Sequence, residues 1–497
     1  MKNRFTKLLS LVLAFILCAG MLAACGPTDP GSKPVNHPNV VTDEADILKG
    51  ITDDTIWVGN TAGTTGAISY IGKPFNIGIQ AAFSVYNNAG GYNGKSIKLK
   101  HYDDGALAEN SGPLLEKLLH TDEVFAIVGH FGGYAVSGTL STLIDEEVPM
   151  IYAAAGIPEL LNENAHTLGE MGIVPIQPLN ETEGRMLILR AFAPTDKGGL
   201  GATKVGVIAD SDEASQGLLK GIKNEMANLS ADRRNNIIIQ EVKSNDYSGA
   251  VNALKAAGCD TVILTVSGNP FKKTLTTMAD AKYNCNVLTS YNNASVADFN
   301  LSSGELRSQM VKVFETVNVF AQAWLDISSD YEYSKDTALF AALKKQSLDE
   351  YGVVVESIPG FTEEYWSVAE HIYDYVVSLN DPMLDPLSLC ADPYALAGYI
   401  AGDLFCQAME ELEKSGLPLA RANLVHILES KEYKIAMSDT LSFANGMRAG
   451  VQSFALTWMF DTYNLPEDQG KTEHHSASMV TVHGLMSIEE YRALLSK

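Results

Sequence analysis

The sequence predicts an α/β protein built from two lobes, each a doubly wound parallel sheet. Short apolar runs bounded by turns alternate with segments of helical periodicity. This alternation occurs twice, over residues 55–152 and again over residues 182–289. The chain of 497 residues also exceeds what one hydrophobic core normally organises. Because short apolar strands are typical of parallel sheets covered on both faces, and right-handed crossovers join them, both halves should be doubly wound.

The first half shows how the elements are assigned. In the helix expected over Pro74–Asn88, Pro74 suits the first turn, and the apolar residues from Phe75 onward follow helical spacing until Gly90-Gly91 ends them. The expected strands are Thr55–Val58, Ser96–Tyr102, Val124–Val128 and Pro149–Tyr152. The other expected helices are Ala108–His120 and Tyr134–Asp145.

The second half repeats this order, and a mostly helical, acid-rich region follows it. The repeat has expected helices at Thr182–Phe192, Glu213–Asn228, Ser248–Ala257 and Pro270–Ala281, and strands at Lys204–Ala209, Asn236–Glu241, Thr261–Thr265 and Asn286–Thr289. Later helices are expected at Lys335–Gln346, Thr362–Leu379, Tyr394–Lys414 and Leu419–Glu429, and a late strand at Leu456–Tyr463. The apolar stripe from Trp366 to Val376 predicts core packing.

The N-terminus has the pattern of an export signal. Lys2, Arg4 and Lys7 precede the uncharged run Leu8–Leu22, which is too short to span a membrane. The run ends in Leu22-Ala23-Ala24-Cys25, which resembles the lipobox of bacterial lipoproteins. This resemblance implies that residues 1–24 are removed and that Cys25 carries the lipid; the alternative is an ordinary secretory signal with an incidental cysteine.

The segment after this cysteine is expected to be a tether. Residues 25–54 are rich in Pro, Gly, Asp and Asn and poor in apolar residues. We therefore expect a mature protein held outside the cytoplasm at the bacterial cell membrane by its N-terminal lipid, because several acyl chains anchor stably where one does not.

Charge and cysteine content narrow the class further. The net charge of −24 argues against a nucleic-acid partner and against a polybasic membrane patch. Cys259, Cys285, Cys390 and Cys406 have no metal-type spacing. We expect buried free thiols, although an exported chain leaves one or two disulfides open, with undetermined pairing.

Two loops with small side chains are candidate ligand contacts. Ligands of wound sheets bind at the carboxyl ends of the strands, so two facing lobes would place a site in the cleft between them. Gly129–Gly133 lies between a strand and a helix, where backbone N–H groups can hold an anion or a carbonyl. The alternative is a tight turn only. The loop Ala153–Glu159 follows the next strand and also lacks bulky side chains, so the two loops would form one wall of the cleft.

No catalytic or metal-binding pattern is present. Gly94-Lys95-Ser96 ends like a phosphate loop, but Ala89 stands where that loop needs glycine. Asp103-Asp104 are adjacent on a strand and would point to opposite faces. Glu473–His475 and His483 lack the spacing of metal ligands and are expected in a solvated loop. We therefore expect no catalytic residue, no metal and no cofactor.

The chain resembles the type I periplasmic binding proteins that serve ABC importers of branched-chain amino acids, amides and related solutes. The resemblance is carried by Asn60–Gly72, Asn87–Lys95, Tyr102–Asp104, Val128–His130 and Val148–Leu160, and it weakens through Val205–Leu218 to Ser442–Phe460. It implies a hinge of three strands, with crossings near Asn180, Asn318 and Gly446. One lobe would then hold residues 55–181 and 318–445, and the other residues 182–317 and 446–497.

Departures from the family pattern bear on the ligand. Family members use hydroxyl residues to bind an amino-acid carboxylate where this chain has Gly133 and Gly156, and an acid to bind the ammonium where it has Tyr291-Asn292-Asn293. The position of a frequent family aromatic is Ala214. A buried ammonium without an anion is costly, so a zwitterion is not the expected ligand.

We expect instead a small organic molecule, possible classes being an amino acid, an amide or an aromatic compound, held among four tyrosines. The predicted ligand-binding residues are Tyr70, Gly132, Gly133, Tyr134, Tyr152, Ala154, Gly156, Ser267, Tyr291 and Asn292.

The resemblance implies a function without chemistry. A monomeric, lipid-anchored solute-binding protein would capture its ligand in the interlobe cleft and deliver it to the permease of an ABC transporter. A ligand sensor of the same fold that signals to a membrane receptor is the alternative. An anchored extracellular enzyme is a third class.

Overall fold

The computed structural model describes residues 49–296, 299–301, 304–466 and 471–496. The predicted signal peptide, Cys25 and most of the predicted tether lie outside the described residues. The described residues belong to one compact unit. No helix among the described residues is long and apolar enough to cross a membrane.

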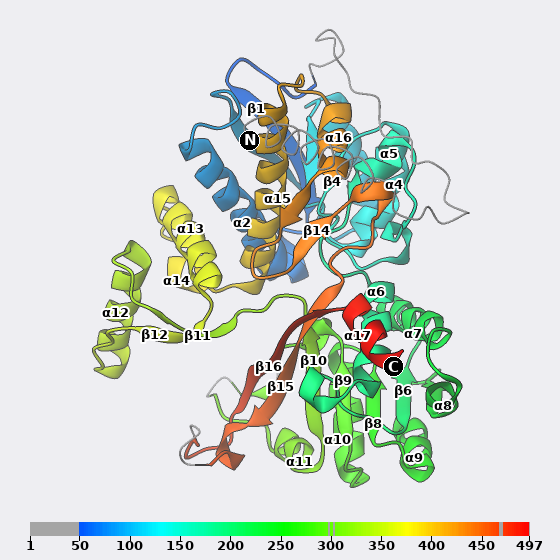
Figure 1. Cartoon of the computed structure of the whole chain (residues 1–497). Coiled ribbons are helices and arrows are strands. Elements are labelled where there is room, and N and C mark those ends of the chain that lie inside the picture. The colour runs from blue at the N-terminus through cyan, green and yellow to red at the C-terminus, as the bar shows by residue number, and fades with distance from the viewer. Residues whose placement is uncertain (1–48, 297–298, 302–303, 467–470, 497) are drawn as a thin grey trace, which may run out of the picture. The chain divides into compact units, whose positions relative to one another are not determined.

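The first sheet has five parallel strands in the order β2-β1-β3-β4-β5. Two of them, β1 and β4, are labelled in Figure 1. Its strands are β1 (Thr55–Ala62), β2 (Ser96–Asp103), β3 (Ala126–Val128), β4 (Met150–Ile151) and β5 (Ile173–Val174). The helices that alternate with them are α2 (Ser69–Asn88), α3 (Ala108–His120), α4 (Gly133–Asp145) and α5 (Leu168–Gly172). Buried apolar residues lie on both faces, which explains why β3, β4 and β5 are apolar throughout. The edge strand β2 instead carries Lys98, Lys100 and His101.

Later helices pack around this sheet and its helices. They are α13 (Glu363–Leu379), α14 (Pro386–Cys390), α15 (Pro393–Ser415) and α16 (Arg421–Ser430). Helix α15 contacts β3 and β4, whereas α13, α14 and α16 pack on other helices. Helix α15 packs along α2 with backbone contact, because a Cβ at Gly398 would lie 1.9 Å from the Phe75 carbonyl oxygen, and one at Gly78 1.9 Å from that of Ala395. The stripe predicted to be core is buried at Trp366, as expected.

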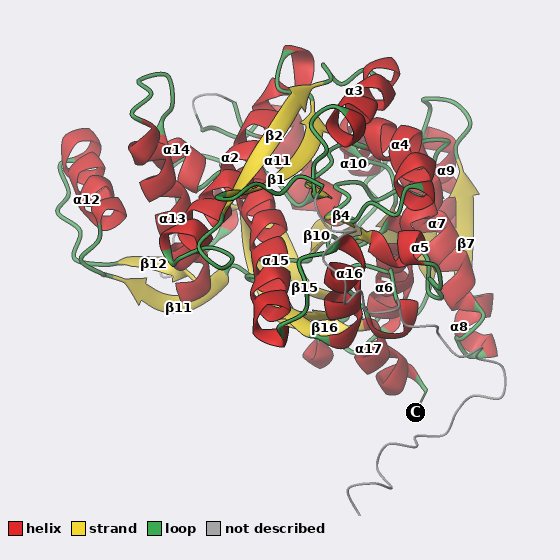
Figure 2. Ribbon diagram, turned by 90° about the horizontal axis from the view of Figure 1, so that it is seen from above, coloured by secondary structure: helices red, strands yellow, loops and turns green. Residues whose placement is uncertain are grey.

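The second sheet has seven strands in the order β16-β15-β10-β9-β8-β6-β7. Strands β6 (Val205–Ala209), β7 (Ile237–Glu241), β8 (Thr261–Leu264), β9 (Asn286–Thr289) and β10 (Asn318–Ala323) are parallel, and β15 (Ser453–Asp461) and β16 (Ala477–Ser487) extend them in antiparallel pairing. The associated helices are α6 (Asn180–Phe192), α7 (Glu213–Met226), α8 (Ala231–Asn235), α9 (Ser248–Ala257), α10 (Gly268–Asp280), α11 (Ser308–Thr316) and α17 (Ile488–Leu495). Seen from above, helices lie on both sides of the strands (Figure 2).

Two antiparallel pairs of short strands and one helix remain. Strand β11 (Ser328–Tyr333) pairs with β12 (Ile358–Phe361), and α12 (Ala338–Tyr351) connects them. Strand β13 (Glu432–Lys434) pairs with β14 (Thr440–Ser442).

Three segments connect the two sheets, after β5, after β10 and before β15. Because β10 pairs with β9 and β15, residues 318–323 belong to the second sheet, beyond the lobe boundary predicted at Asn318.

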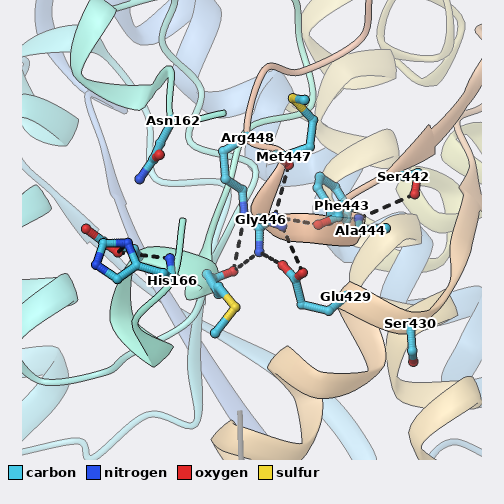
Figure 3. A network of polar contacts seen from close by, with 12 residues as sticks. Asn162, His166, Glu429, Ser430, Ser442, Phe443, Ala444, Gly446, Met447 and Arg448 are labelled. Carbon is cyan, nitrogen blue, oxygen red and sulfur yellow. Dashed lines mark hydrogen bonds and ion pairs between the residues drawn. The ribbon is translucent and has the colours of Figure 1, made fainter. Parts of the chain in front are cut away.

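The third connection is fixed by a buried ion pair (Figure 3). The Arg448 guanidinium contacts the Glu429 carboxylate at the end of α16, and both side chains are shielded from solvent. Arg448 also donates to the carbonyl oxygens of Met171, at 3.1 Å, and Phe443, at 3.0 Å. The Gly446 N–H donates to the second Glu429 oxygen at 3.1 Å. This network holds the chain to α16 and to the end of α5 immediately before β15 begins.

Three local expectations differ from the structure. Helix α2 begins at Ser69, so Pro74 lies inside it and leaves one carbonyl of the preceding turn without its helical partner. His483 lies on β16 and not in a loop. The boundary near residue 318 moves, as described above. The four described cysteines, Cys259, Cys285, Cys390 and Cys406, are all buried and free, so no disulfide forms among them.

Candidate functional site

A polar cluster supports the loops at the carboxyl end of the first sheet. The buried Asp104 carboxylate accepts hydrogen bonds from the Thr61 hydroxyl at 2.9 Å, the Tyr134 hydroxyl at 3.1 Å and the Ala106 N–H at 2.9 Å. No lysine or arginine forms an ion pair with it among the described residues. Neutral donors therefore stabilise this buried carboxylate and connect β1, β2 and α4.

His130 joins the glycine loop to this cluster as a neutral group. Burial lowers the pKa of His130 to about 4. Its Nδ1 lies 3.4 Å from the Thr61 N–H, and its Nε2 lies 3.0 Å from Thr139 Oγ1. Because the Thr139 hydroxyl donates to the Ala135 carbonyl, Nε2 must carry the proton and donate to Thr139. The imidazole is thus part of the scaffold of the loop.

The two loops predicted as one wall are bonded to each other. The Gly132 N–H donates to the Ala154 carbonyl at 3.2 Å, and the Ala154 N–H donates to the His130 carbonyl at 2.9 Å. Gly132 has φ +100°, which favours glycine, and α4 begins at Gly133 immediately after it. A Cβ at Gly156 would lie 2.7 Å from Asn180 Oδ1, so the second loop also packs against the start of α6.

The four tyrosines predicted around the ligand do not enclose one space. Tyr70 is 64% exposed and its ring lies 6.4 Å from that of Tyr394, while Tyr134 is bonded to the Asp104 cluster. Tyr152 is 1% exposed, and its hydroxyl donates to Gln177 at 3.0 Å. Tyr70 and Tyr134 therefore lie in different surroundings from Tyr152, which is near Tyr291.

Tyr291 is the tyrosine of this set that lines a large pocket. Its hydroxyl donates to the Pro178 carbonyl at 3.1 Å, in the first segment that connects the sheets. Burial, with the nearby Glu183 and Tyr152, raises the pKa of Tyr291 well above its usual value. Its hydroxyl therefore stays protonated and can donate this hydrogen bond.

Ser267 and Asn292 lie at loop ends on the second sheet. Ser267 precedes α10, and its hydroxyl is shielded from solvent without a hydrogen-bond partner among the described residues. Asn292 is exposed, and its N–H donates to the Ser290 hydroxyl at 3.1 Å. Ligand contacts of both residues stay predictions.

Glu183 was missed at the sequence level although it organises the loop that carries Tyr291. Its fully buried carboxylate accepts from the Ser290 hydroxyl at 2.7 Å and from the Tyr291 N–H at 2.8 Å. Burial raises the pKa of Glu183 to about 7. The available signal was an acid on α6 with the apolar Met186 and Leu187 three and four positions later, which predicts that its face of the helix is buried.

The pocket lined by Tyr291 has a volume of about 1010 Å³. Its walls come from residues 291–296 after β9, 323–330 after β10, and 478–484 of β16. Phe361 of β12, and Pro393 and Leu396 at the start of α15, complete it. This volume is at the upper end for sites that bind small organic molecules. Of the predicted ligand-binding residues, Tyr291 alone lines this pocket, because its walls are far apart in the sequence.

Comparison with known proteins identifies the family. A model of the periplasmic binding protein family matches residues 55–325, more than half of the chain. The chain therefore belongs to the periplasmic binding protein family, whose members bind solutes and are not enzymes. The predicted fold class is confirmed.

Individual relatives are distant. An amino acid binding protein from Pseudomonas aeruginosa is 26% identical over 211 residues, which cover 41% of this chain and only 52% of that protein. A fatty acid ABC transporter substrate-binding protein from Thermomonospora curvata has 16% identity and a TM-score of 0.55, covering 90% of this chain and 96% of that one.

A third relative is an ABC transporter solute binding protein from Rhodopseudomonas palustris BisB5, solved in complex with 3,4-dihydroxy benzoic acid. It has 15% identity and a TM-score of 0.52, and the match covers 88% of this chain and 98% of that one. At these identities the structural likeness shows the shared fold.

Proposed function

We propose that this protein is a lipid-anchored, extracytoplasmic solute-binding protein that delivers a small organic molecule to an ABC importer. One observation carries the proposal: a pocket of about 1010 Å³ is lined by loops of the second sheet and by the start of α15, a helix that packs on the first sheet. Residues of the second sheet and of a helix packed on the first sheet thus contact one space. A ligand there would join them, as hinged closure of a binding protein requires.

The relatives support a solute with an apolar body. They are described as binding proteins for amino acids, fatty acids or an aromatic acid. The pocket contains the aromatic rings of Tyr291, Trp324 and Phe361 together with aliphatic side chains. We propose Tyr291 as a direct contact. The predicted contacts Gly132, Gly133 and Ala154 do not line this pocket and stay predictions.

The test of binding uses the purified protein itself. The full chain is isolated under native conditions, denatured, and its released small molecules are identified by mass spectrometry. We expect one class of organic solute at a stoichiometry near one per chain, and recovery of binding when that solute is added back in calorimetry. A protein that releases no solute, and binds none of a broad panel of solutes, would contradict the proposal.

The anchor has a separate test. Cells that express the protein are labelled with an alkyne-bearing fatty acid, and the Cys25→Ser variant serves as the control. We expect label in the wild-type protein, located in the membrane fraction, and none in the variant. Equal labelling of both proteins would contradict lipid attachment at Cys25.

Delivery to a permease and signalling to a receptor predict different partners. We expect that ligand-loaded protein stimulates ATP hydrolysis by an ABC transporter of the same cell in proteoliposomes, and that the transporter accumulates the solute. Ligand-dependent capture of a kinase or chemoreceptor ectodomain, without transport, would instead favour the sensor.

A further inference from the structure

We propose that the pocket beside Tyr291 selects an organic cation, an amine or quaternary ammonium with an apolar body, and that Asp326 is the partner of its charge. This inference rests on the proposed solute-binding function and names its ligand class. The acid comes from the segment after β10, and not from residues 291–293, where the family resemblance would place it.

The charges around the pocket have one sign. Its lining contains two carboxylates, Asp326 and Asp330, and contains no lysine or arginine. His483 also lines it, with Nδ1 3.1 Å from the Gly484 carbonyl oxygen. Because a carbonyl oxygen can only accept a hydrogen bond, Nδ1 carries a proton and donates to it. A pocket lined by one sign of charge attracts the opposite sign and repels its own. An acid of the kind bound by two relatives would therefore meet repulsion here.

Asp326 is placed to meet such a cation. Its Oδ1 is shielded from solvent and has no hydrogen-bond partner among the described residues. On the other side, its Oδ2 lies beside Gly484 of β16, where an added Cβ would be 3.3 Å away. The Asp326 N–H donates to the Met437 carbonyl at 2.7 Å, which holds the backbone of the segment in place. A shielded carboxylate oxygen without a donor is costly, and an ammonium N–H supplies that donor.

The rest of the lining suits the body of such a ligand. The lining includes the aromatic residues Trp324, Tyr291 and Phe361. It also includes the aliphatic residues Leu325, Ile327 and Leu396. Aromatic faces bury apolar groups and also attract cations. Aromatic walls with one shielded carboxylate are a common arrangement for binding organic ammonium groups. A cation also needs no anion-binding hydroxyl, and this chain has glycine at the two positions, 133 and 156, where family members carry such hydroxyls.

The experiment compares three probes with the same phenylpropyl body: 3-phenylpropylamine, 3-phenylpropanol and 3-phenylpropanoate. Their affinities for the purified full chain are measured by calorimetry and by the fluorescence of Trp324, with Trp324→Phe identifying that signal. We expect the amine to bind at least about tenfold more tightly than the alcohol, and the acid more weakly than the alcohol.

Two variants assign the charge. Asp326→Asn should weaken the affinity for the amine about tenfold or more and change the affinity for the alcohol by less than about twofold. The affinity for the acid should rise relative to that for the amine. Asp330→Asn is the matched control, because Asp330 lies in the same lining but is exposed, and it should change each affinity by less than about threefold. Tighter binding of the acid than the amine, failure of all three probes to bind, or equal effects of the two variants would overturn the assignment. The proposed function is judged separately, since recovery of an acidic or neutral solute from the native protein would support solute binding and overturn only the cation.

Discussion

At the scale of single residues, buried charges define how the connecting segments are held. Arg448 and Glu429 form a buried ion pair, and every hydrogen bond of the Arg448 guanidinium described above stays within this network (Figure 3). Removing one partner of such a pair leaves the other as an unpaired buried charge, which is far more costly than losing an exposed pair.

Arg448→Met should therefore destabilise the protein strongly, by about 3–5 kcal/mol. The matched control is Lys345→Met, because Lys345 pairs with Asp349 on the exposed surface of α12, where the loss should be about 0–1 kcal/mol. Chemical denaturation of both variants measures the difference. Equal midpoints for the two variants would show that the buried network contributes no more than a surface pair.

Glu183 makes stability depend on pH. Its pKa is about 7 in the folded protein and ordinary in the unfolded chain, so the folded state holds the proton more tightly. The contribution of Glu183 to the free energy of unfolding is therefore fully present below about pH 4.5. It is lost as the pH rises towards 7, which lowers the free energy of unfolding by up to about 3 kcal/mol.

Glu183→Gln should remove this dependence, because an amide keeps the size of the side chain without ionising. The free-energy difference between variant and wild type should shift in favour of the variant between pH 5 and pH 8, as measured by urea denaturation. Comparing the two proteins cancels His130, whose lowered pKa costs stability only as pH falls below about 6.5. A difference that is constant with pH would contradict an ionising Glu183.

At the scale of elements, the apolar periodicity of the sequence predicted helices well, but it did not predict the edge strand β16 of the second sheet. The predicted ranges of α3 and α9 and of strand β9 match the structure, because each has a clear apolar pattern and a clear end. Strand β16 was missed because its side chains alternate only between half-buried and exposed, so the apolar period is absent. Pairing with β15, not local sequence, makes it a strand.

Helix α15 depends on α2 through glycine contacts. Gly398→Ala would force a Cβ against the Phe75 carbonyl and separate the two helices, which should cost several kcal/mol in unfolding free energy, about 2 or more. Gly138→Ala on α4 is the matched control, since it has no neighbour within 4 Å and should be neutral or stabilising by about 0.5–1 kcal/mol. Thermal unfolding compares them, and a stable Gly398→Ala protein would contradict the close packing.

At the scale of the whole molecule, no disulfide ties the described residues together. The four cysteines from Cys259 to Cys406 are buried, and burial raises the pKa of Cys285 and of Cys390 to about 12. Thiols of this kind are inert until the protein opens.

A thiol reagent should therefore leave the Cys25→Ser protein unmodified in its native form and label four mature-chain thiols after denaturation in guanidinium. A reducing agent should leave its unfolding temperature unchanged. Fewer than four thiols in the denatured, unreduced protein would reveal a disulfide.

The sequence by itself determined the wound α/β class, the two repeats and the family, because each depends on patterns within a few tens of residues. The glycine loops were also found in this way. Only the tertiary structure decided which residues share a space. The pocket brings together residues 291–296, 323–330 and 478–484 with Pro393, and it leaves Tyr152 in the core and Tyr70 at the surface. Local periodicity fixes which face of an element is buried, but crossovers and strand pairing decide which distant loops meet, and Asp326 acquires its role only there.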